Sequence, residues 1–230
     1  MFVRSIVADA FGTNCYVVAP ERGEECVIVD PGIGVTSRVQ ELLREHRLRP
    51  AAVLLTHGHL DHVYSVTPVC AGTTAAYIHT DDRYRLVDPM ASLGPELRLA
   101  MEQQFGRSAT WKEPEDVVEV TGHQQLELAG MQLAITHAPG HTEGSVLFSL
   151  EGLPDGIPAL DLDRTVLSGD VLFAGSIGRT DLPGGDPAAM QRSLRDVVLP
   201  LADSTLVLPG HGPATTMARE RVANPWLQGL

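Results

Sequence analysis

The feature that most constrains this chain is a run of metal-capable side chains at residues 57–62, within the stretch LTHGHLDHVY (55–64). Three histidines and one aspartate fall within six positions, in a sequence with nine histidines in all. The run follows residues 51–55, whose continuous apolar character predicts a strand buried on both faces. Open α/β sheets place ligands beyond the carboxyl ends of such strands. The run therefore predicts a metal site at the end of a strand.

The spacing inside the run favours two ions over one. His57 and His59 are two positions apart and point to the same side of an extended backbone, and Gly58 between them permits a tight turn. Asp61 and His62 are adjacent, so their side chains diverge unless a helix begins there. Four ligands this close do not fit comfortably around one tetrahedral ion, since a catalytic zinc ion usually takes three protein ligands and a water.

Two ions need further ligands, and three turns that follow predicted strands supply them. His141 lies in ITHAPGHTEGS, Asp170 in VLSGD and His211 in LVLPGHGP. The full set then holds five histidines and two aspartates, enough for three ligands on each ion and one bridging carboxylate. His137 lies close to His141 in the sequence, but its place inside a predicted strand indicates packing. Asp30 ends another strand, where it is either a turn residue or a hydrogen-bond partner of a ligand histidine.

Short apolar segments of strand-like length recur along the chain. The predicted strands are residues 26–30, 51–55, 75–78, 131–136, 145–150, 164–169 and 204–209. A helix is predicted at 35–48, with Thr36 or Ser37 as its N-cap. A second helix is predicted at 186–201, with Asp186 as its N-cap before a proline. This mixture favours a layered α/β fold.

Length and composition predict one domain over residues 1–230, since 230 residues with 43% hydrophobic content suit a single α/β core. No apolar run reaches the length of a transmembrane helix, and the N-terminal MFVRSIVADA lacks the apolar core of a signal peptide. Cys15, Cys26 and Cys70 form no disulfide pattern and favour a reducing cytoplasm. The net charge of −12 argues against nucleic-acid binding. A monomer or homodimer acting on a small molecule is expected.

Residues 88–115 interrupt the sequence of strands and are predicted to form a lid or a substrate-facing insertion, with a helix around 95–105. A surface excursion or a subunit contact is the alternative. The apolar candidates for a pocket wall are Met90, Leu93, Leu97, Met101 and Phe105. The basic candidates for meeting a substrate carboxylate are Arg98, Arg107 and Lys112.

Taken in order, the motifs THGHLDH, PGHTEGS, SGDVLF and PGHGP resemble those of the metallo-β-lactamase-fold hydrolases, over about residues 12–224. GRTDLPGGD and PGHGPATTMARERVANPW are similar to the glyoxalase II-like (hydroxyacylglutathione hydrolase-like) branch and to its sulfur-dioxygenase relatives. The resemblance implies a four-layer αβ/βα sandwich with the site at one sheet edge. It implies His57, His59 and His141 for a first metal ion, Asp61, His62 and His211 for a second, and Asp170 as the bridge.

The resemblance implies a binuclear hydrolase that uses two divalent ions, with zinc favoured and iron or manganese as alternatives. The expected reaction is attack of a metal-bridging hydroxide on a thioester carbonyl, with Asp61 and Asp170 as catalytic residues. A thiolate leaves without help from a general acid. The presence of both aspartates argues against the most common antibiotic β-lactamases. The chain ends at NPWLQGL, before the helical segment with which full-length glyoxalase II enzymes bind glutathione. The resemblance therefore leaves open whether the thiol part of the substrate is glutathione or another small thiol.

Two other functions remain open on the sequence alone. One is a persulfide dioxygenase of the same fold, with one iron at His57, His59 and either Asp170 or His141. The other is a metal-binding domain without turnover.

Overall fold

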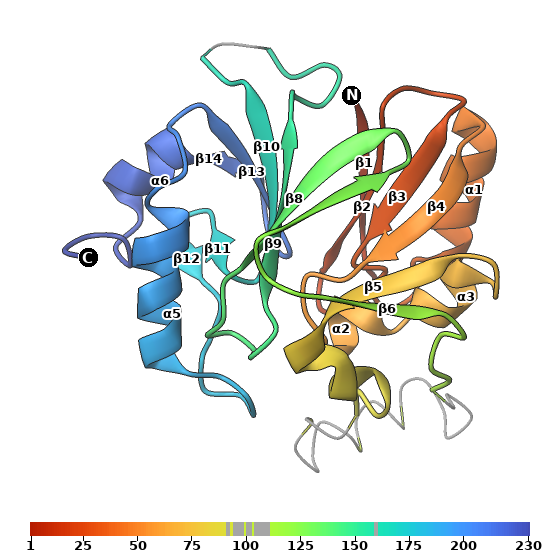
Figure 1. Ribbon diagram of the computed structural model, residues 1–230, viewed down its shortest axis with the longest axis horizontal. Helices are drawn as coiled ribbons and strands as arrows, with labels where there is room; N and C mark the ends of the chain where they lie inside the picture. Colours follow the sequence, from red (N-terminus) through yellow and green to blue (C-terminus); the bar gives the residue numbers. More distant parts are fainter. Residues whose placement is uncertain (91–92, 94–98, 100–102, 104–110, 159–160) are drawn as a thin grey trace.

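Two six-stranded sheets face each other, and helices cover both outer faces, in the computed structural model of the chain (Figure 1). The structure describes residues 1–90, 93, 99, 103, 111–158 and 161–230. The arrangement is the predicted four-layer αβ/βα sandwich, which is therefore confirmed.

The first sheet has the order β1-β2-β3-β4-β5-β6. Its strands are β1 (Phe2–Val7), β2 (Asn14–Ala19), β3 (Glu25–Val29), β4 (Arg49–Leu54), β5 (Ala75–His79) and β6 (Val117–Val120). Strands β3 to β6 run parallel to one another, and β1, β2 and β3 pair antiparallel. Helices α1 (Thr36–His46) and α3 (Val66–Cys70) pack on its outer face. The short helix α2 (Leu60–Val63) and the 3₁₀ helix η1 (Thr80–Leu86) follow β4 and β5.

The second sheet has the order β14-β13-β10-β9-β8-β7. Its strands are β7 (Gln124–Leu128), β8 (Met131–His137), β9 (Val146–Glu151), β10 (Arg164–Gly169), β13 (Thr205–Pro209) and β14 (Thr215–Thr216). The helices on its outer side are α5 (Pro187–Ser193), the π-helical turn η2 (Leu194–Val198) and α6 (Met217–Ala223). A two-stranded ribbon, β11 (Leu172–Phe173) with β12 (Ser176–Ile177), leads out of β10.

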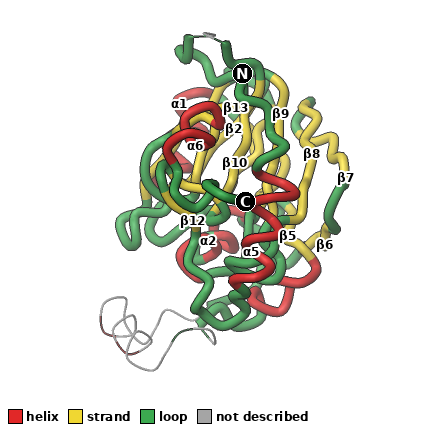
Figure 2. The backbone as a smooth tube through the Cα atoms, turned by 90° about the vertical axis from the view of Figure 1, so that its left-hand side faces the viewer, coloured by secondary structure: helices red, strands yellow, loops and turns green. Residues whose placement is uncertain are grey.

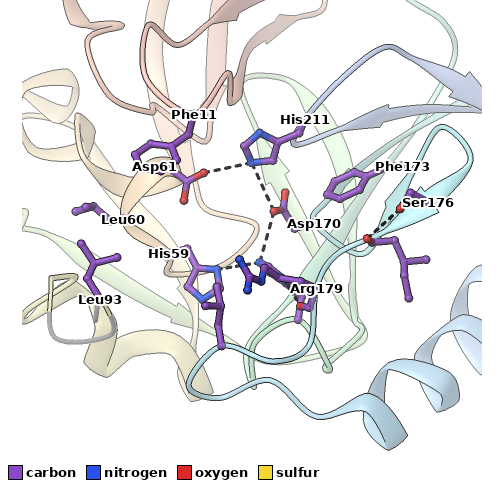
Figure 3. Close-up of a pocket in the computed structure, with 13 residues that line it drawn as sticks. Phe11, His59, Leu60, Asp61, Leu93, Asp170, Phe173, Ser176, Arg179 and His211 are labelled. Atoms are coloured by element: carbon purple, nitrogen blue, oxygen red, sulfur yellow. Dashed lines mark hydrogen bonds and ion pairs between the residues drawn. The ribbon is translucent and has the colours of Figure 1, made fainter. Parts of the chain in front are cut away.

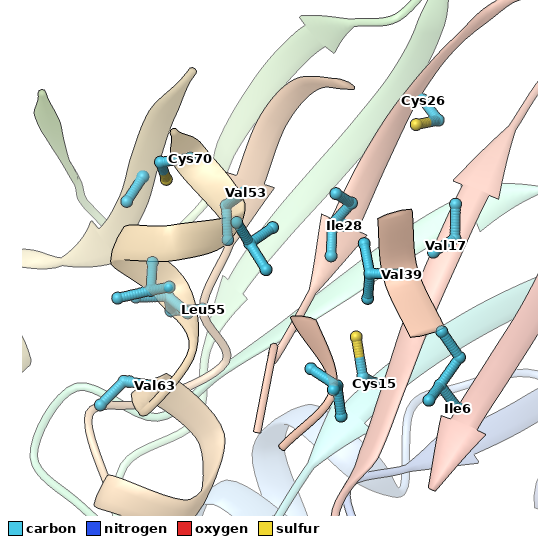
Figure 4. Close-up of a cluster of buried hydrophobic side chains, with 14 of the residues drawn as sticks. Ile6, Cys15, Val17, Cys26, Ile28, Val39, Val53, Leu55, Val63 and Cys70 are labelled. Atoms are coloured by element: carbon cyan, nitrogen blue, oxygen red, sulfur yellow. The ribbon is translucent and has the colours of Figure 1, made fainter. Parts of the chain in front are cut away.

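Strand β2 contributes side chains to two apolar layers, one on each face of its sheet. Its side chains alternate, so that Val17 packs under the helices and Val18 packs between the two sheets. Cys15 lies in the helix-facing cluster with Val17 (Figure 4). The three cysteines are buried and unpaired, and burial raises the pKa of Cys26 to about 12. They behave as small apolar core residues.

All seven predicted strands are present, with bounds that shift by one or two residues. Strands β1, β2, β6 and β7 and the two-residue strands β11, β12 and β14 were not predicted. Asp186 caps α5 as predicted, since its side chain accepts from the N–H groups of the next turn. The predicted cap of α1 is wrong: the N-cap position is Val35, and no side chain caps the helix.

Two described residues of the 88–115 segment pack beside α2. Met90 and Leu93 contact the apolar pair Ile33 and Leu60. Lys112 lies in a separate hollow and pairs with Glu115. Its contact with a substrate carboxylate stays a prediction. Leu97, Arg98, Met101, Phe105 and Arg107 lie outside the described residues, as does most of the predicted helix at 95–105.

Among the described residues, no helix combines the length and the apolar character needed to cross a membrane. The N-terminus lies near the top of the molecule and α2 in its lower half in two perpendicular views (Figures 1 and 2). The loops around α2 carry the candidate site.

Candidate metal centre

The seven predicted metal-binding residues converge at one edge of the sandwich. They come from four segments: His57 and His59 in the loop after β4 with Asp61 and His62 in the adjoining α2, His141 between β8 and β9, Asp170 after β10, and His211 after β13. The two sheets are tied together at this edge, since the N–H of Asn14 donates to the carbonyl of Gly210 at 2.7 Å. Loops that are far apart in the sequence therefore meet at one point.

Three imidazoles form the first half of the site, called here the three-histidine cluster: His57, His59 and His141. One ring nitrogen of each lies within 4.8 Å of the other two. His59 Nδ1 and His141 Nε2 are 2.8 Å apart. All three side chains are buried, and their rings meet edge to face.

Asp61, His62 and His211 form the second half, called here the mixed cluster. Nε2 of His211 lies 3.2 Å from Oδ2 of Asp61 and 3.2 Å from Nε2 of His62. Asp170 lies between the two halves. Its Oδ1 is 3.3 Å from His62 Nε2, and its Oδ2 is 3.5 Å from Nε2 of both His141 and His211. This is the position that a bridging carboxylate would occupy.

Hydrogen bonds behind the rings set which nitrogen faces the site. The hydroxyl of Thr56 donates to Asp30 at 2.6 Å and therefore accepts from Nδ1 of His57, 3.1 Å away. Nδ1 of His62 donates to Asp30 at 2.9 Å. Asp30 is thus a hydrogen-bond partner of a candidate ligand, as one of the two predictions for it stated. His57 therefore directs an unprotonated Nε2 inward, and His62 directs its Nε2 toward Asp170.

His141 is oriented in the same way, because its Nδ1 donates to the backbone carbonyl of Arg179 at 2.8 Å. Among the described residues, His57 Nε2, His59 Nε2 and Asp170 Oδ1 are buried without a hydrogen-bond partner. Buried polar atoms are normally satisfied, so unpartnered atoms around converging lone pairs fit a divalent cation. Imidazole and carboxylate donors suit zinc, iron or manganese.

The three-histidine cluster favours neutral imidazoles. Burial lowers the pKa of His57 well below its ordinary value, and the neighbouring histidines lower it further. Burial also lowers the pKa of His59 to about 3, with additional contributions from His141 and the Arg85 guanidinium. A neutral imidazole is the form that binds a metal ion.

The mixed cluster has the opposite electrostatics. Burial opposes protonation of His62, but the carboxylates of Asp170, Asp61 and Asp30 together raise its pKa above the ordinary value. The pKa of His211 is also raised, against burial, by Asp61 and Asp170. Protons therefore compete with a metal ion for this half of the site.

Three polar residues that the sequence analysis did not single out hold these loops. Thr13 Oγ1 donates to Asp61 Oδ2 at 3.0 Å, and the Asn14 amide donates to the carbonyls on either side of the His211 turn. The buried Asp82 contacts the loops of the three-histidine cluster. No local motif marks these positions, because their partners are distant in the sequence.

His137 lies outside the seven-residue group. Its ring stacks on that of His79 with the centroids 4.0 Å apart, and its Nε2 is 2.7 Å from the carbonyl oxygen of Glu143. With Asp81 these two histidines form a separate small cluster. One ligand atom of each lies within 4.8 Å of the other two, and the packing role of His137 stays a prediction.

A cavity of about 460 Å³ opens beside the two clusters (Figure 3). Its walls are largely apolar. Phe11, Leu60 and Leu93 lie on one side, and Phe173, Ile177 and Leu182 complete the lining. Arg179 is the only arginine or lysine among the described lining residues, and its guanidinium is bound at 2.7 Å by both carboxylate oxygens of Asp181.

Comparison with known proteins assigns the family. The model of the metallo-beta-lactamase superfamily matches residues 8–211. An uncharacterised protein of Mycobacterium tuberculosis is 42% identical, covering 100% of this chain and 99% of its own. Hydroxyacylglutathione hydrolase GloC of Haemophilus influenzae is 30% identical, covering 99% of this chain and 98% of its own.

Two solved structures are similar over nearly the whole chain. The B3 metallo-beta-lactamase BLEG-1 superposes with a TM-score of 0.79 at 33% identity, covering 99% of this chain and 100% of that one. TTHA1623, solved in a di-iron-bound form, gives 0.75 at 33% identity, covering 97% and 100%. The chain belongs to the metallo-β-lactamase superfamily and has its fold.

Proposed function

We propose that this chain is a metal-dependent hydrolase that cleaves the thioester of a small-thiol conjugate. One observation carries the proposal: two adjacent clusters share Asp170 and direct imidazole nitrogens and carboxylate oxygens to one side of a largely apolar cavity. The similarity to a hydroxyacylglutathione hydrolase supports thioester cleavage.

The residues have separate roles in this proposal. His57, His59 and His141 would hold one divalent ion, Asp61, His62 and His211 a second, and Asp170 would contact both. When bound, such ions lower the pKa of a coordinated water and polarise a carbonyl oxygen. Zinc is favoured, with iron or manganese as alternatives.

Side chains of the protein would orient the attacking water. Asp61, which accepts from Thr13, has its pKa held below the ordinary range by His62 and His211 in spite of burial, so it stays ionised. An ionised carboxylate at this position can accept a hydrogen bond from the attacking water and orient it. The thiolate product needs no proton to leave.

The cavity supports a substrate with an uncharged acyl or thiol portion of modest size. Its volume is within the usual range for small-molecule sites, and its walls are apolar. Arg179 is engaged by Asp181 and offers little to a substrate carboxylate. A role of residues 88–115 as a lid, a cytoplasmic location, a single domain and a monomeric or dimeric state stay predictions.

The experiment is elemental analysis of the purified chain together with turnover assays on matched thioester and oxygen-ester substrates. Two metal ions per chain and selective thioester cleavage are expected. A metal-loaded chain that hydrolyses no thioester would contradict the proposal. Hydrolysis of a β-lactam instead would place its activity with that of the enzyme named in the similar structure.

A persulfide dioxygenase is the second candidate, because the three-histidine cluster by itself suffices for one iron ion and the similar TTHA1623 binds iron. One iron per chain with oxygen consumption on a persulfide would favour it. A metal-binding domain without turnover would bind metal but show neither reaction.

A further inference from the structure

A buried carboxylate outside the predicted ligand set, Asp82, lies between the loops of the three-histidine cluster. Helix η1 begins directly after β5, and Asp82 in its first turn has no exposed surface. A carboxylate at such a position costs free energy unless hydrogen bonds satisfy its oxygens. The partners of the two oxygens therefore define what this residue positions.

Oδ2 of Asp82 joins the two histidine loops directly. It accepts from the backbone N–H of Gly58 at 2.7 Å and from the hydroxyl of Thr142 at 2.7 Å. Gly58 separates the two histidines of segment 57–59, and Thr142 follows His141. One oxygen atom thus sets the distance between the two loops that carry the three imidazoles.

Oδ1 of Asp82 completes the contact. It accepts from the backbone N–H of Gly144 at 2.9 Å and from Nε of Arg85 at 3.2 Å. Arg85 is itself buried and donates to the carbonyl of Pro183 at 2.9 Å and to Glu143 at 2.7 Å. Four donors satisfy the carboxylate, and two of them are backbone groups of the histidine loops.

Close packing enforces the same arrangement. A Cβ atom at Gly58 would lie 2.7 Å from Cβ of Arg85, and one at Gly144 would lie 2.6 Å from Cβ of Asp82. Side chains do not tolerate these distances, so both loops approach η1 this closely only because they carry glycine. The glycines of the two histidine motifs therefore serve the contact with η1.

We propose that Asp82 is a positioning residue that fixes the spacing of the loops of the three-histidine cluster and thereby sets that cluster's affinity for a divalent cation. The inference rests on the metal centre of the proposed function and is independent of its substrate. The mixed cluster is contacted directly by Asp30 and Thr13, and Asp30 reaches the three-histidine cluster only through Thr56. Loss of the Asp82 contacts should therefore weaken one cluster and spare the other.

The test measures zinc affinity of each cluster separately, by competition with a chromophoric chelator. His211→Ala leaves the three-histidine cluster as the stronger site, and His59→Ala leaves the mixed cluster. Asp82→Asn keeps the side-chain size but places an amide N–H₂ against donors. It should weaken zinc binding about 10- to 100-fold in the His211→Ala background. In the His59→Ala background the change should stay within about threefold.

Asp81→Asn is the matched control, because it makes the same charge change on the same helix at a side chain that is half exposed. It should leave both affinities within about threefold. Thr142→Val removes one hydrogen bond of the Asp82 carboxylate at similar volume. It should weaken the three-histidine cluster alone by about threefold to tenfold, and it keeps the test decisive if Asp82→Asn does not fold.

Equal weakening in the two backgrounds, no weakening in either, or an equal effect of Asp81→Asn would overturn the inference. A wild-type chain that binds no zinc, iron or manganese would instead overturn the proposed function. Selective weakening of the three-histidine cluster by both Asp82→Asn and Thr142→Val would establish Asp82 as its positioning residue.

Discussion

The three-histidine cluster and the mixed cluster lie side by side but differ in charge. The first holds imidazoles whose pKa values burial keeps low, so that they are neutral and ready to bind a cation. The second holds a carboxylate and two imidazoles whose pKa values are raised by neighbouring carboxylates. Protons therefore compete with a metal ion at the mixed cluster but not at the three-histidine cluster.

The two clusters also depend on different parts of the fold. Asp82 in η1 contacts the loops of the first, whereas Asp30 after β3 and Thr13 before β2 contact residues of the second. Each set of contacts reaches its cluster from behind, away from the cavity. The two halves should therefore be separable by mutation.

The largest effect is expected from His59→Ala, which removes a member of the three-histidine cluster. The change should lower kcat/KM by about 1000-fold or more, since the chemistry that a cation supplies would be lost. Bound metal should fall while the domain stays folded, as measured by elemental analysis and circular dichroism. His137→Ala is the matched control and should retain its metal, because His137 lies outside the seven-residue group. An active His59→Ala chain with full metal content would refute the assignment.

Asp30→Asn should act on the mixed cluster directly, through His62, and on the three-histidine cluster only through Thr56, whose hydroxyl accepts from His57. The carboxylate is buried and accepts from His62, the backbone N–H of Thr56 and the Thr56 hydroxyl. Its loss should weaken zinc binding in the His59→Ala background by about 10- to 100-fold. Asp9→Asn, at an exposed carboxylate, is the control. A greater loss at the three-histidine cluster would reverse the comparison between the halves.

The zinc affinities of the two clusters should diverge as pH falls, by about tenfold per pH unit for each proton that the metal ion displaces. The pKa values of His62 and His211 are raised above the ordinary 6.5, so both take up protons already above that pH, and the zinc affinity of the mixed cluster should decrease as pH falls through the neutral range. The lowered pKa of His59, about 3, keeps the three-histidine cluster unprotonated over the same range. Zinc titrations at several pH values in the two single-cluster backgrounds test this. Parallel pH profiles would contradict it.

The smallest effect is expected from Arg179→Ala. The carbonyl of Arg179 holds His141, but its side chain is 61% exposed and pairs only with Asp181 among the contacts described. Metal content should stay unchanged, and zinc affinity should stay within about threefold. A larger loss, measured in the His211→Ala background, would mean that the ion pair, and not the backbone alone, positions His141.

Much of the site could be predicted from the sequence because the candidate ligands lie in short segments directly after strands. The His-Gly-His-Leu-Asp-His segment lies at a strand end, and the three further residues each follow a short β-branched run. The N-cap of α5 was predictable for the same reason, since Asp186 and its partners are two and three residues apart. The cap of α1 was not, because a serine or threonine near a helix start makes no cap unless the backbone places it there.

The sequence by itself determined the fold class, the positions of seven strands and the seven residues that converge at the sheet edge. Only the tertiary structure decided which residues stand behind them: Asp82 is 24 positions from Gly58 and 62 from Gly144, and Asp30 is 32 from His62. Periodicity and spacing report contacts within a strand, a helix or a turn. Contacts between loops depend on the order of strands in the sheets and on how closely they pack, and no local pattern encodes that order.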